Sequence, residues 1–592
     1  MRKKKKDRSA GRRSNRERQM EKPMTELIPM VTDAAAPPGT AQLQAEQASH
    51  GPCPVCGFGA RQPDRFCRQC GINFEQWRDA ITDSLYATST ITSEFIESPP
   101  VRQKKNTGSN GSDGGSGKVN PTFPLLTGHI LATNEHRFDL VVIGSGPAGQ
   151  KGAIAAAKLG KRVAIIDRRE RIGGVSLHTG TIPSKTLREA VLYLTGYRQR
   201  AFYGRDFKLK EEISVADLAE RVNTVIARES AVIREQLGRN GVTLIDGAAR
   251  FTGPHTLEVE GGQKTRMVEA DHILIACGTR AARPAEIPFG EEVMDADQLG
   301  QATRIPRDFI VVGAGVIGLE YASMLAALGT KVTVIDQRPA ILDFVDREIV
   351  EALSYHLRRQ DAVFRLGEKV TAVGINGRGR VQVELASGKR LRAEGLLYAA
   401  GRQANTDLLN LAAAGLEPDS RGRIIVNERF QTPVGHIYAA GDCIGFPALA
   451  ATSMEQGRMA ASHMFGQPTA SRPSLLPYGI YTVPEISMVG RTEQELTSAG
   501  IPYETGVARY EEIAKGQIVG DETGMLKILF HPDTLKLLGV HAIGENATEI
   551  IHIGQTALAL DGGVEFLRDS VFNYPTFAEA YKVAALNGLN KL

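Results

Sequence analysis

From residue 138 to the C-terminus, short runs of apolar residues alternate with longer segments of helix-forming composition. Short runs rich in Val and Ile are typical of strands that are buried on both faces of a parallel sheet. The clearest runs are residues 139–143, 163–167, 309–312 and 331–336. The segments 151–159 and 319–328 follow two of these runs and favour helix. Because strand and helix alternate, we expect an α/β protein with parallel sheets and helices on their faces.

Residues 1–50 show the opposite pattern, with no sustained apolar periodicity. They open with the basic run 2–6 and continue into Ala-, Pro- and Gln-rich sequence, which cannot bury enough apolar surface to offset the entropy of ordering. We therefore expect a disordered basic tail. The simpler interpretation of the basic run is a solvated arm, and an anionic partner such as nucleic acid or a membrane surface is the alternative. The Gly- and Ser-rich residues 107–117 predict that 76–135 is a flexible linker.

Four of the six cysteines lie between the tail and the linker, in two Cys-x-x-Cys pairs. They are Cys53, Cys56, Cys67 and Cys70. Four thiolates can close a tetrahedron around Zn²⁺ and leave no position open for water, so the predicted site is structural. The matched spacing makes unrelated buried or redox cysteines the weaker alternative. We expect a zinc ribbon over 51–75, and an unidentified partner for this ribbon and the basic tail.

The composition indicates several globular domains, because 592 residues with 42% hydrophobic and 23% charged content exceed the size of one core. The net charge is +4, and much of this excess lies in the first 22 residues, so charge gives no strong case for nucleic-acid binding. No apolar run is long enough to span a bilayer, and no apolar segment of a secretory signal follows the basic N-terminus. Cysteines at metal-ligand spacing favour a reducing compartment. We expect a cytoplasmic protein without a membrane span.

A glycine-rich turn follows the first predicted strand. Gly144, Gly146 and Gly149 have the spacing G-x-G-x-x-G and precede a predicted helix. The first two glycines allow a tight turn and close approach to a pyrophosphate, the third lets the helix pack on the strand, and the helix N-terminus attracts negative charge. Asp167 ends the next strand, where a carboxylate accepts hydrogen bonds from a ribose. The complete pattern predicts a dinucleotide site.

The same pattern recurs later in the chain with Gly313, Gly315, Gly318 and Asp336. Two such units favour two bound dinucleotides, as in a flavin enzyme that receives electrons from a nicotinamide, and a single occupied unit is the weaker alternative. Asp336 ends its strand where an acid bonds the 2′-hydroxyl of NAD, whereas Arg338 can pair with the 2′-phosphate of NADP. We therefore expect both nicotinamides to be accepted.

Three further motifs carry a family resemblance. They are residues 173–185, 275–280 and 437–442. All three resemble segments of the flavin disulfide reductases, such as dihydrolipoyl dehydrogenase and glutathione reductase. The resemblance implies that Gly278 lies in a connecting motif next to the nicotinamide region, and that Gly441 and Asp442 belong to a second flavin-binding motif. It also makes the first glycine unit an FAD domain and the second an NAD(P) domain inserted within it.

The implied architecture has two Rossmann-like dinucleotide-binding domains and an α+β C-terminal dimerisation domain. The FAD domain is expected at 136–297 and 404–470, the NAD(P) domain at 298–403 and the dimerisation domain at 471–592. By the same resemblance, the protein is expected to form a homodimer in which Tyr574 reaches the flavin of the partner.

Ser176 and Thr181 stand where this family carries the two cysteines of its redox-active disulfide. Neither hydroxyl can cycle between dithiol and disulfide. Tyr574 stands where the family has the histidine that exchanges protons with those thiols, and tyrosine ordinarily ionises at about pH 10. The resemblance further implies that Lys185 and Glu320 pair beside the flavin N5, where an ammonium favours the anion formed as hydride arrives. We therefore expect hydride transfer without thiol chemistry.

The segments 180–185, 313–323 and 573–590 narrow the resemblance to the soluble pyridine nucleotide transhydrogenases, over roughly residues 136–592. This implies that hydride passes from NADPH to NAD⁺ through reduced FAD, with one nicotinamide leaving before the next enters. Val316 stands where some relatives carry a gating tyrosine. One alternative is a diaphorase or oxidase that passes electrons from NAD(P)H to a quinone or oxygen. The other is a regulatory protein, targeted by the zinc ribbon, with a non-catalytic flavin fold.

Overall fold

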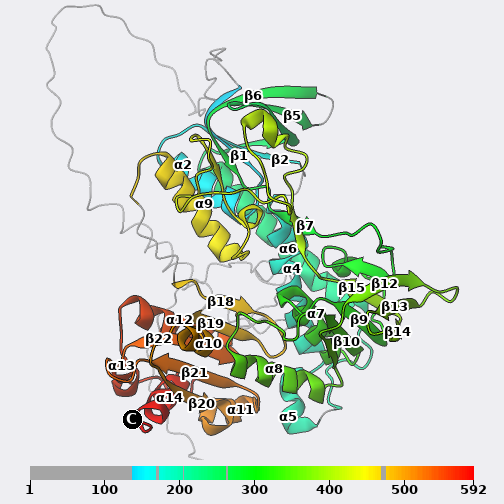
Figure 1. Cartoon of the computed structure of the whole chain (residues 1–592), viewed down its shortest axis with the longest axis vertical. Helices are drawn as coiled ribbons and strands as arrows, with labels where there is room; N and C mark the ends of the chain where they lie inside the picture. The colour runs from blue at the N-terminus through cyan, green and yellow to red at the C-terminus, as the bar shows by residue number, and fades with distance from the viewer. Residues whose placement is uncertain (1–135, 169–171, 205, 262–263, 469–474) are drawn as a thin grey trace, which may run out of the picture. The chain divides into compact units, whose positions relative to one another are not determined.

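The computed structural model describes residues 136–592 except 169–171, 205, 262–263 and 469–474 (Figure 1). The expected basic tail, zinc ribbon and linker lie outside the described residues, as do their cysteines Cys53, Cys56, Cys67 and Cys70. Within the described part of the chain, no three His, Cys, Asp or Glu side chains are grouped so that they could hold a metal ion. No helix in that part is long and apolar enough to cross a membrane.

The first sheet has seven strands in the order β3-β2-β1-β6-β5-β4, with β17 also pairing with β6. Its strands are β1 (Arg137–Ile143), β2 (Val163–Asp167), β3 (Thr243–Asp246), β4 (Ala248–Gly253), β5 (Thr256–Gly261), β6 (Lys264–Ile275) and β17 (Ile437–Ala439). The pairs among β3, β2, β1, β6 and β17 are parallel, whereas β4 and β5 add an antiparallel extension. Strand β17 therefore returns to this sheet after the second unit of the chain.

Six helices accompany this sheet in the sequence. They are α2 (Pro147–Lys158), α3 (Gly174–His178), α4 (Thr181–Leu194), α5 (Arg200–Tyr203), α6 (Val215–Arg239) and α9 (Ala450–Met464). Helix α2 begins with a proline directly after Gly146, a position where the missing N–H costs no helical hydrogen bond. It lies side by side with α9 (Figure 1). The two helices are so close that a Cβ at Gly457 would come within 2.0 Å of the Ala148 carbonyl oxygen. Glycine is therefore required where these two helices touch.

The second sheet has five parallel strands in the order β11-β10-β9-β15-β8. They are β8 (Val293–Asp295), β9 (Asp308–Val312), β10 (Lys331–Asp336), β11 (Val363–Leu366) and β15 (Gly395–Tyr398), with the helices α7 (Val316–Ala327) and α8 (Arg347–Arg359). An antiparallel sheet of β12 (Val370–Ile375), β13 (Val381–Leu385) and β14 (Arg390–Ala393) is inserted before β15. A ribbon of β7 (Thr279–Ala281) and β16 (Arg402–Ala404) joins the chain where it leaves and re-enters the first unit.

The third sheet is antiparallel, in the order β18-β19-β22-β21-β20. Its strands are β18 (Tyr478–Ile480), β19 (Ile486–Gly490), β20 (Glu504–Arg509), β21 (Met525–Phe530) and β22 (Leu537–Ile543). Its helices are α10 (Glu493–Ser498), α11 (Ala514–Val519), α12 (Ala547–Ala559), α13 (Val564–Asp569) and α14 (Glu579–Leu589). The predicted fold class, two Rossmann-like units followed by an α+β unit, is confirmed.

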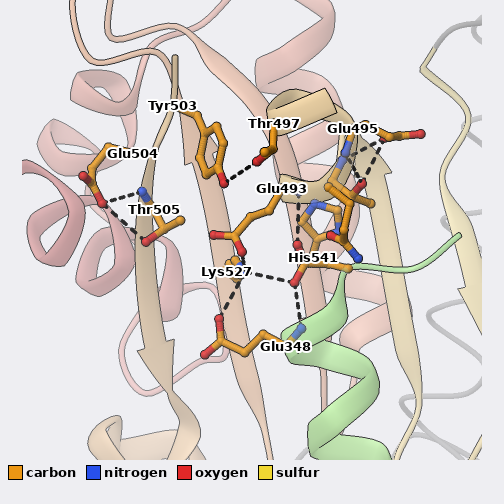
Figure 2. A network of polar contacts seen from close by, with 12 residues as sticks. Glu348, Glu493, Glu495, Thr497, Tyr503, Glu504, Thr505, Lys527 and His541 are labelled. Carbon is orange, nitrogen blue, oxygen red and sulfur yellow. Dashed lines mark hydrogen bonds and ion pairs between the residues drawn. The ribbon is translucent and has the colours of Figure 1, made fainter. Parts of the chain in front are cut away.

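A buried lysine connects the second unit to the third sheet (Figure 2). The Lys527 side chain on β21 is 1% exposed, and its ammonium lies 2.9 Å from Asp346, the residue that caps the N-terminus of α8. Glu348 and Glu493 approach the same ammonium at 3.1 and 3.2 Å. A buried charge is tolerated only when it is paired. Asp346 and Glu348 belong to the N-terminus of α8, so their bonds to Lys527 hold α8 against the third sheet, whereas Glu493 belongs to α10 of the same unit as Lys527.

Candidate active site

A cavity of about 690 Å³ is lined by residues from both glycine turns and from the third sheet. It lies beyond the ends of β1 and β9, where the open sheets of α/β proteins bind their ligands. Ser145 and Val316, which belong to the two glycine turns, both line it. So does Tyr478 of β18. One cavity is therefore shared by the three units of the chain, each of which is built on one of the three sheets.

The first glycine turn has the geometry of a dinucleotide cradle. Gly144 has a φ of +105°, and a Cβ at Gly149 would lie 2.0 Å from the Gly144 carbonyl oxygen. Gly146, in contrast, has no atom within 4 Å of its Cβ position and lines the cavity, so the chain leaves room there for a phosphate. Asp167 accepts hydrogen bonds from the backbone N–H, at 2.9 Å, and the hydroxyl of Ser145. These groups fit the pyrophosphate and ribose of a dinucleotide.

The second flavin motif borders the same cavity. Gly278 has a φ of +63° and Gly441 a φ of +82°, a backbone conformation that favours glycine. Asp442 accepts a hydrogen bond from the Thr279 hydroxyl at 3.2 Å. All four residues line the cavity, although 163 positions separate Asp442 from Thr279. The structure therefore brings the connecting motif and the second flavin motif together at one cavity.

The second glycine turn repeats the geometry of the first. Gly313 has a φ of +107°, and a Cβ at Gly318 would lie 1.9 Å from the Gly313 carbonyl oxygen. Gly315 again has no atom within 4 Å of its Cβ position. Asp336 accepts a hydrogen bond from the Ala314 N–H at 2.7 Å, as Asp167 does from Ser145. The chain thus presents two cradles of the same design.

Lys185 and Glu320 form an ion pair at the cavity. Lys185 lies in the first turns of α4, and Glu320 lies in α7, the helix that follows the second glycine turn. The lysine amine donates to both carboxylate oxygens at 2.8 and 2.7 Å. The Glu320 side chain is 5% exposed and the Lys185 side chain 25% exposed, so the pair faces the cavity from a largely dry position. The structure therefore joins two candidate residues that lie in different nucleotide units.

The sequence did not identify Tyr481, which organises this pair. Its backbone N–H donates to Glu320 at 2.9 Å, and its ring centroid lies 4.9 Å from the Lys185 amine, a cation–π distance. Residues 480 and 482 are buried, and the backbone N–H of Val483 bonds to Ser323 of α7 at 3.0 Å, which holds this segment in place. No motif reports such a contact, because it depends on how the third sheet packs on α7.

Tyr478 is a second cavity residue that the sequence did not identify. Its ring packs against Phe344, with centroids 5.0 Å apart, and stacks on Phe446 at 6.2 Å and 17°. Burial, together with the nearby carboxylates of Glu320 and Asp442, raises the pKa of Tyr478 to about 12. Its hydroxyl therefore stays protonated at neutral pH. Of these three rings only that of Tyr478 lines the cavity, and the other two pack against it.

Hydroxyl side chains occupy the two positions of the family disulfide. Ser176 and Thr181 both line the cavity, and the Ser176 hydroxyl donates to the Gly173 carbonyl at 3.0 Å. The cysteines among the described residues, Cys277 and Cys443, are both free thiols; Cys277 lines the cavity and Cys443 is buried behind it. The interaction with Cys443, followed by burial, raises the pKa of the Cys277 thiol well above its ordinary value. A thiol of this kind is a poor nucleophile at neutral pH.

Six of the predicted residues in the described part of the chain do not line the cavity: Gly149, Gly313, Gly318, Asp336, Arg338 and Tyr574. Asp336 and Arg338 are ion-paired to each other at 2.9 Å, beyond the residues that line the cavity. Tyr574 precedes α14 and its side chain is exposed, with 73% of the residue accessible in the single chain. An aromatic residue in that position is free to contact another molecule.

Two dinucleotide cradles that share one cavity define an oxidoreductase of the flavin and nicotinamide class. The chain belongs to the pyridine nucleotide-disulphide oxidoreductase family, which matches residues 138–457, and the dimerisation domain of that family matches residues 476–585.

Curated relatives include the soluble pyridine nucleotide transhydrogenase of Mycobacterium tuberculosis (strain ATCC 25177 / H37Ra), which is 58% identical over 458 residues and covers 77% of this chain and 98% of its own. That of Marinomonas sp. (strain MWYL1) is 44% identical over 465 residues, covering 78% of this chain and all of its own.

Two solved structures are also similar to this chain. LpdA from Mycobacterium tuberculosis has a TM-score of 0.70 at 27% identity, over 76% of this chain and 99% of its own. The HOCl-induced flavoprotein disulfide reductase RclA from Escherichia coli has a TM-score of 0.69 at 26% identity, over the same shares.

Proposed function

We propose that this protein is an FAD-dependent transhydrogenase that moves hydride between NADPH and NAD⁺. One observation carries the proposal: the cavity shared by the two glycine cradles holds the Lys185–Glu320 pair, while Ser176 and Thr181 fill the positions of the family disulfide. Electrons that cannot pass to a dithiol must leave by another route. Relatives that are 44–58% identical over their whole length bear the name of this activity.

FAD, when bound, supplies the two-electron chemistry. Gly144 and Gly146 would give its pyrophosphate a tight turn with room and backbone donors, Gly149 lets α2 pack close to that turn, and Asp167 would accept from its adenosine ribose. Further contacts would come from Gly278 of the connecting motif and from Gly441 and Asp442 of the second flavin motif. The Gly313, Gly315 and Gly318 turn receives the nicotinamide dinucleotide that exchanges hydride.

Lys185 places a positive charge at the reacting end of the cavity, and Glu320 holds that charge in position. Because Glu320 receives two bonds from the amine and one from the Tyr481 backbone, the ammonium has little freedom to turn away. A fixed charge in a site of low dielectric stabilises developing negative charge more than water does. Tyr478 lines this side of the cavity, and the rings of Phe344 and Phe446 pack against it from outside the lining.

The active form is proposed to be a homodimer, which the matched dimerisation domain supports. Tyr574 is exposed and occupies the position of the histidine with which the family reaches its partner, so its phenol is proposed to border the partner's cavity. A cytoplasmic location accompanies this proposal.

A structural Zn²⁺ is proposed separately, from the sequence alone, for Cys53, Cys56, Cys67 and Cys70. Metal analysis of the full chain and of Cys53→Ser tests it, with loss of stoichiometric zinc expected in the variant. An equal zinc content in both proteins would refute it.

The direct test of activity mixes the FAD-loaded full chain with NADPH and a spectrally distinct analogue of NAD⁺. Steady reduction of the analogue is expected. Consumption of NADPH that depends on added quinone or oxygen, with no reduction of the analogue, would favour the diaphorase or oxidase instead. If the Lys185→Met variant retained full biological activity, a regulatory role would be favoured.

A further inference from the structure

The carboxylate of Asp336 has four donors on its two oxygens. One oxygen accepts from the backbone N–H of Arg338 at 2.8 Å and from its Nε at 3.1 Å. The other accepts from the N–H of Ala314 at 2.7 Å and from the Arg338 Nη2 at 2.9 Å. A carboxylate has about four lone-pair sites. The 2′-hydroxyl of NAD would therefore have to displace Arg338 in order to bond Asp336.

The Arg338 guanidinium keeps one edge free of Asp336. Its Nε and Nη2 edge is bound to the carboxylate, whereas the terminal edge formed by Nη1 and Nη2 points elsewhere. Among the described residues only Asp343 approaches that edge, at 3.6 Å, and its own side chain is 62% exposed. The Arg338 side chain is 42% exposed, so a ligand can reach it. A two-nitrogen edge of this kind binds a phosphate with two parallel hydrogen bonds.

Both members of the pair remain charged at neutral pH. Burial alone would raise the pKa of Asp336, but the hydrogen bonds from Arg338 and Ala314 hold it below its ordinary value. The hydrogen bond to Asp336 raises the pKa of Arg338. The acid that would repel a 2′-phosphate is thus neutralised by the cation beside it.

We propose that Asp336 is a positioning residue that holds Arg338 for the 2′-phosphate of NADP(H), and is not the acceptor of the 2′-hydroxyl of NAD(H). The inference rests on the proposed function, since an enzyme that exchanges hydride between the two nicotinamides needs one site that takes both. NADP(H) gains the bidentate contact with Arg338. NAD(H) binds the same turn without that contact and without a bond to Asp336.

The test measures ligand binding and needs no hydride transfer. Calorimetry of the FAD-loaded full chain with 2′,5′-ADP and with 5′-AMP isolates the contribution of the 2′-phosphate. In the natural protein, 2′,5′-ADP is expected to bind roughly 10- to 100-fold more tightly than 5′-AMP. Arg338→Ala removes this difference, and Arg338→Lys restores only part of it because an ammonium lacks the planar fork.

Asp336→Asn separates the two roles of the carboxylate because they predict opposite signs. A residue that positions Arg338 makes 2′,5′-ADP bind roughly tenfold more weakly when it is replaced, with 5′-AMP unchanged. A residue that merely repels phosphate makes 2′,5′-ADP bind more tightly when it is replaced. Asp343→Asn is the matched control, since it removes an exposed carboxylate from the same arginine and is expected not to weaken binding.

Unchanged or tighter binding of 2′,5′-ADP by Asp336→Asn would overturn the proposal, as would equal binding by Arg338→Ala and the natural protein. FAD content and thermal midpoint establish that each variant folds. If Asp336→Asn does not fold, Asp336→Glu replaces it, since the longer side chain displaces the carboxylate and is likewise expected to weaken the binding of 2′,5′-ADP. Binding that depends on Arg338 in an enzyme that fails to reduce NAD⁺ would leave this inference standing and remove the proposed function. Hydride exchange between NADPH and NAD⁺, together with equal binding of 2′,5′-ADP by Arg338→Ala and the natural protein, would remove this inference and leave the proposed function standing.

Discussion

The Lys185 amine lies 2.8 and 2.7 Å from the two carboxylate oxygens of Glu320, although 135 positions separate the residues in the sequence. This ion pair joins α4 of the first unit to α7 of the second at the cavity that both units share. The pair therefore places one fixed positive charge where the first and second units meet at the cavity.

Loss of this charge pair should slow hydride transfer far more than it weakens ligand binding. Lys185→Met removes the fixed cation and is expected to lower the rate of flavin reduction by NADPH by roughly 10²- to 10³-fold, whereas the KM for NADPH changes little. Stopped-flow absorbance of the flavin measures the rate.

Glu320→Gln should produce a smaller decrease of the same kind, because the cation remains but is less well held. The control is Glu235→Gln, which breaks an exposed ion pair with Arg239 and should leave the rate unchanged. Equal rates in Lys185→Met and the natural protein would remove the pair from the mechanism.

The glycine turns should separate folding from cofactor binding. A Cβ at Gly149 would lie 2.0 Å from the Gly144 carbonyl oxygen, so Gly149→Ala is expected to destabilise the first unit itself. A Cβ at Gly146 meets no protein atom within 4 Å, so Gly146→Ala should fold but lose FAD, because the methyl group enters the phosphate space. Thermal midpoint and flavin content of the purified variants report the two effects.

The second turn offers the matching pair. Gly315→Ala should keep its FAD and its thermal midpoint but bind NADP⁺ poorly, since its Cβ also points into open space. Gly318→Ala should unfold at lower temperature, because its Cβ would lie 1.9 Å from the Gly313 carbonyl oxygen. Loss of FAD by Gly315→Ala would mean that the two turns have been assigned to the wrong dinucleotides.

Disulfide substrates should not be reduced. Ser176 and Thr181 supply hydroxyls where a dithiol is needed, and the raised pKa of the Cys277 thiol makes it a poor substitute. Assays with NADPH and oxidised glutathione or lipoamide are expected to give background rates. Treatment with an alkylating reagent that leaves Cys277 and Cys443 unmodified is also expected to leave transhydrogenation intact. Turnover of either disulfide would contradict the proposed electron path.

Stability should fall as the pH decreases from about 6.5 to about 4, and His356 is one cause. Burial, assisted by the charge of Arg359, lowers the pKa of His356 to about 4, while its nitrogens bond to Tyr197, Thr523 and Gln360. The folded pKa is below that of the unfolded chain, so the stabilisation is complete above pH 6.5. As the unfolded state takes up the proton between about pH 6.5 and pH 4, the free energy of unfolding decreases by roughly 3 kcal/mol.

The variant His356→Gln should show a shallower decrease of thermal midpoint over this pH range, even if it is less stable throughout. His552→Gln replaces an exposed imidazole on α12 and serves as the control, with no change in slope expected. An unchanged slope in His356→Gln would show that other groups set the acid sensitivity.

The local parts of the fold were predictable from sequence because local spacing determines them. The strand, glycine turn and helix around Gly144 and around Gly313 follow from the conformational needs of their own residues, and the pattern places each acid at the end of the next strand. The return of β17 to β6 was implied by the family resemblance, not by periodicity. The antiparallel strands β4 and β5, which extend the sheet beyond β6, were not predicted from the sequence pattern.

The contacts that complete the site were not predictable, because they depend on packing between distant segments. Tyr481 reaches Glu320 across 161 positions, and Tyr478 meets Phe344 and Phe446 only because three units converge. Asp336 could be placed at the end of its strand, but not the four donors that fill its lone pairs. The number of donors on the Asp336 carboxylate depends on the side-chain geometry of Arg338, which the spacing of residues in the sequence does not determine.

Hydride taken from NADPH is proposed to leave for NAD⁺ with no thiol between them. The most direct measurement is anaerobic and in two steps: the FAD-loaded protein is bleached with one equivalent of NADPH, separated from nucleotide, and then mixed with NAD⁺. Oxidised flavin absorbance is expected to return in a single rapid phase, with one NADH formed per flavin. Flavin that stays reduced in the presence of NAD⁺, and recovers only when oxygen or a quinone is admitted, would contradict it.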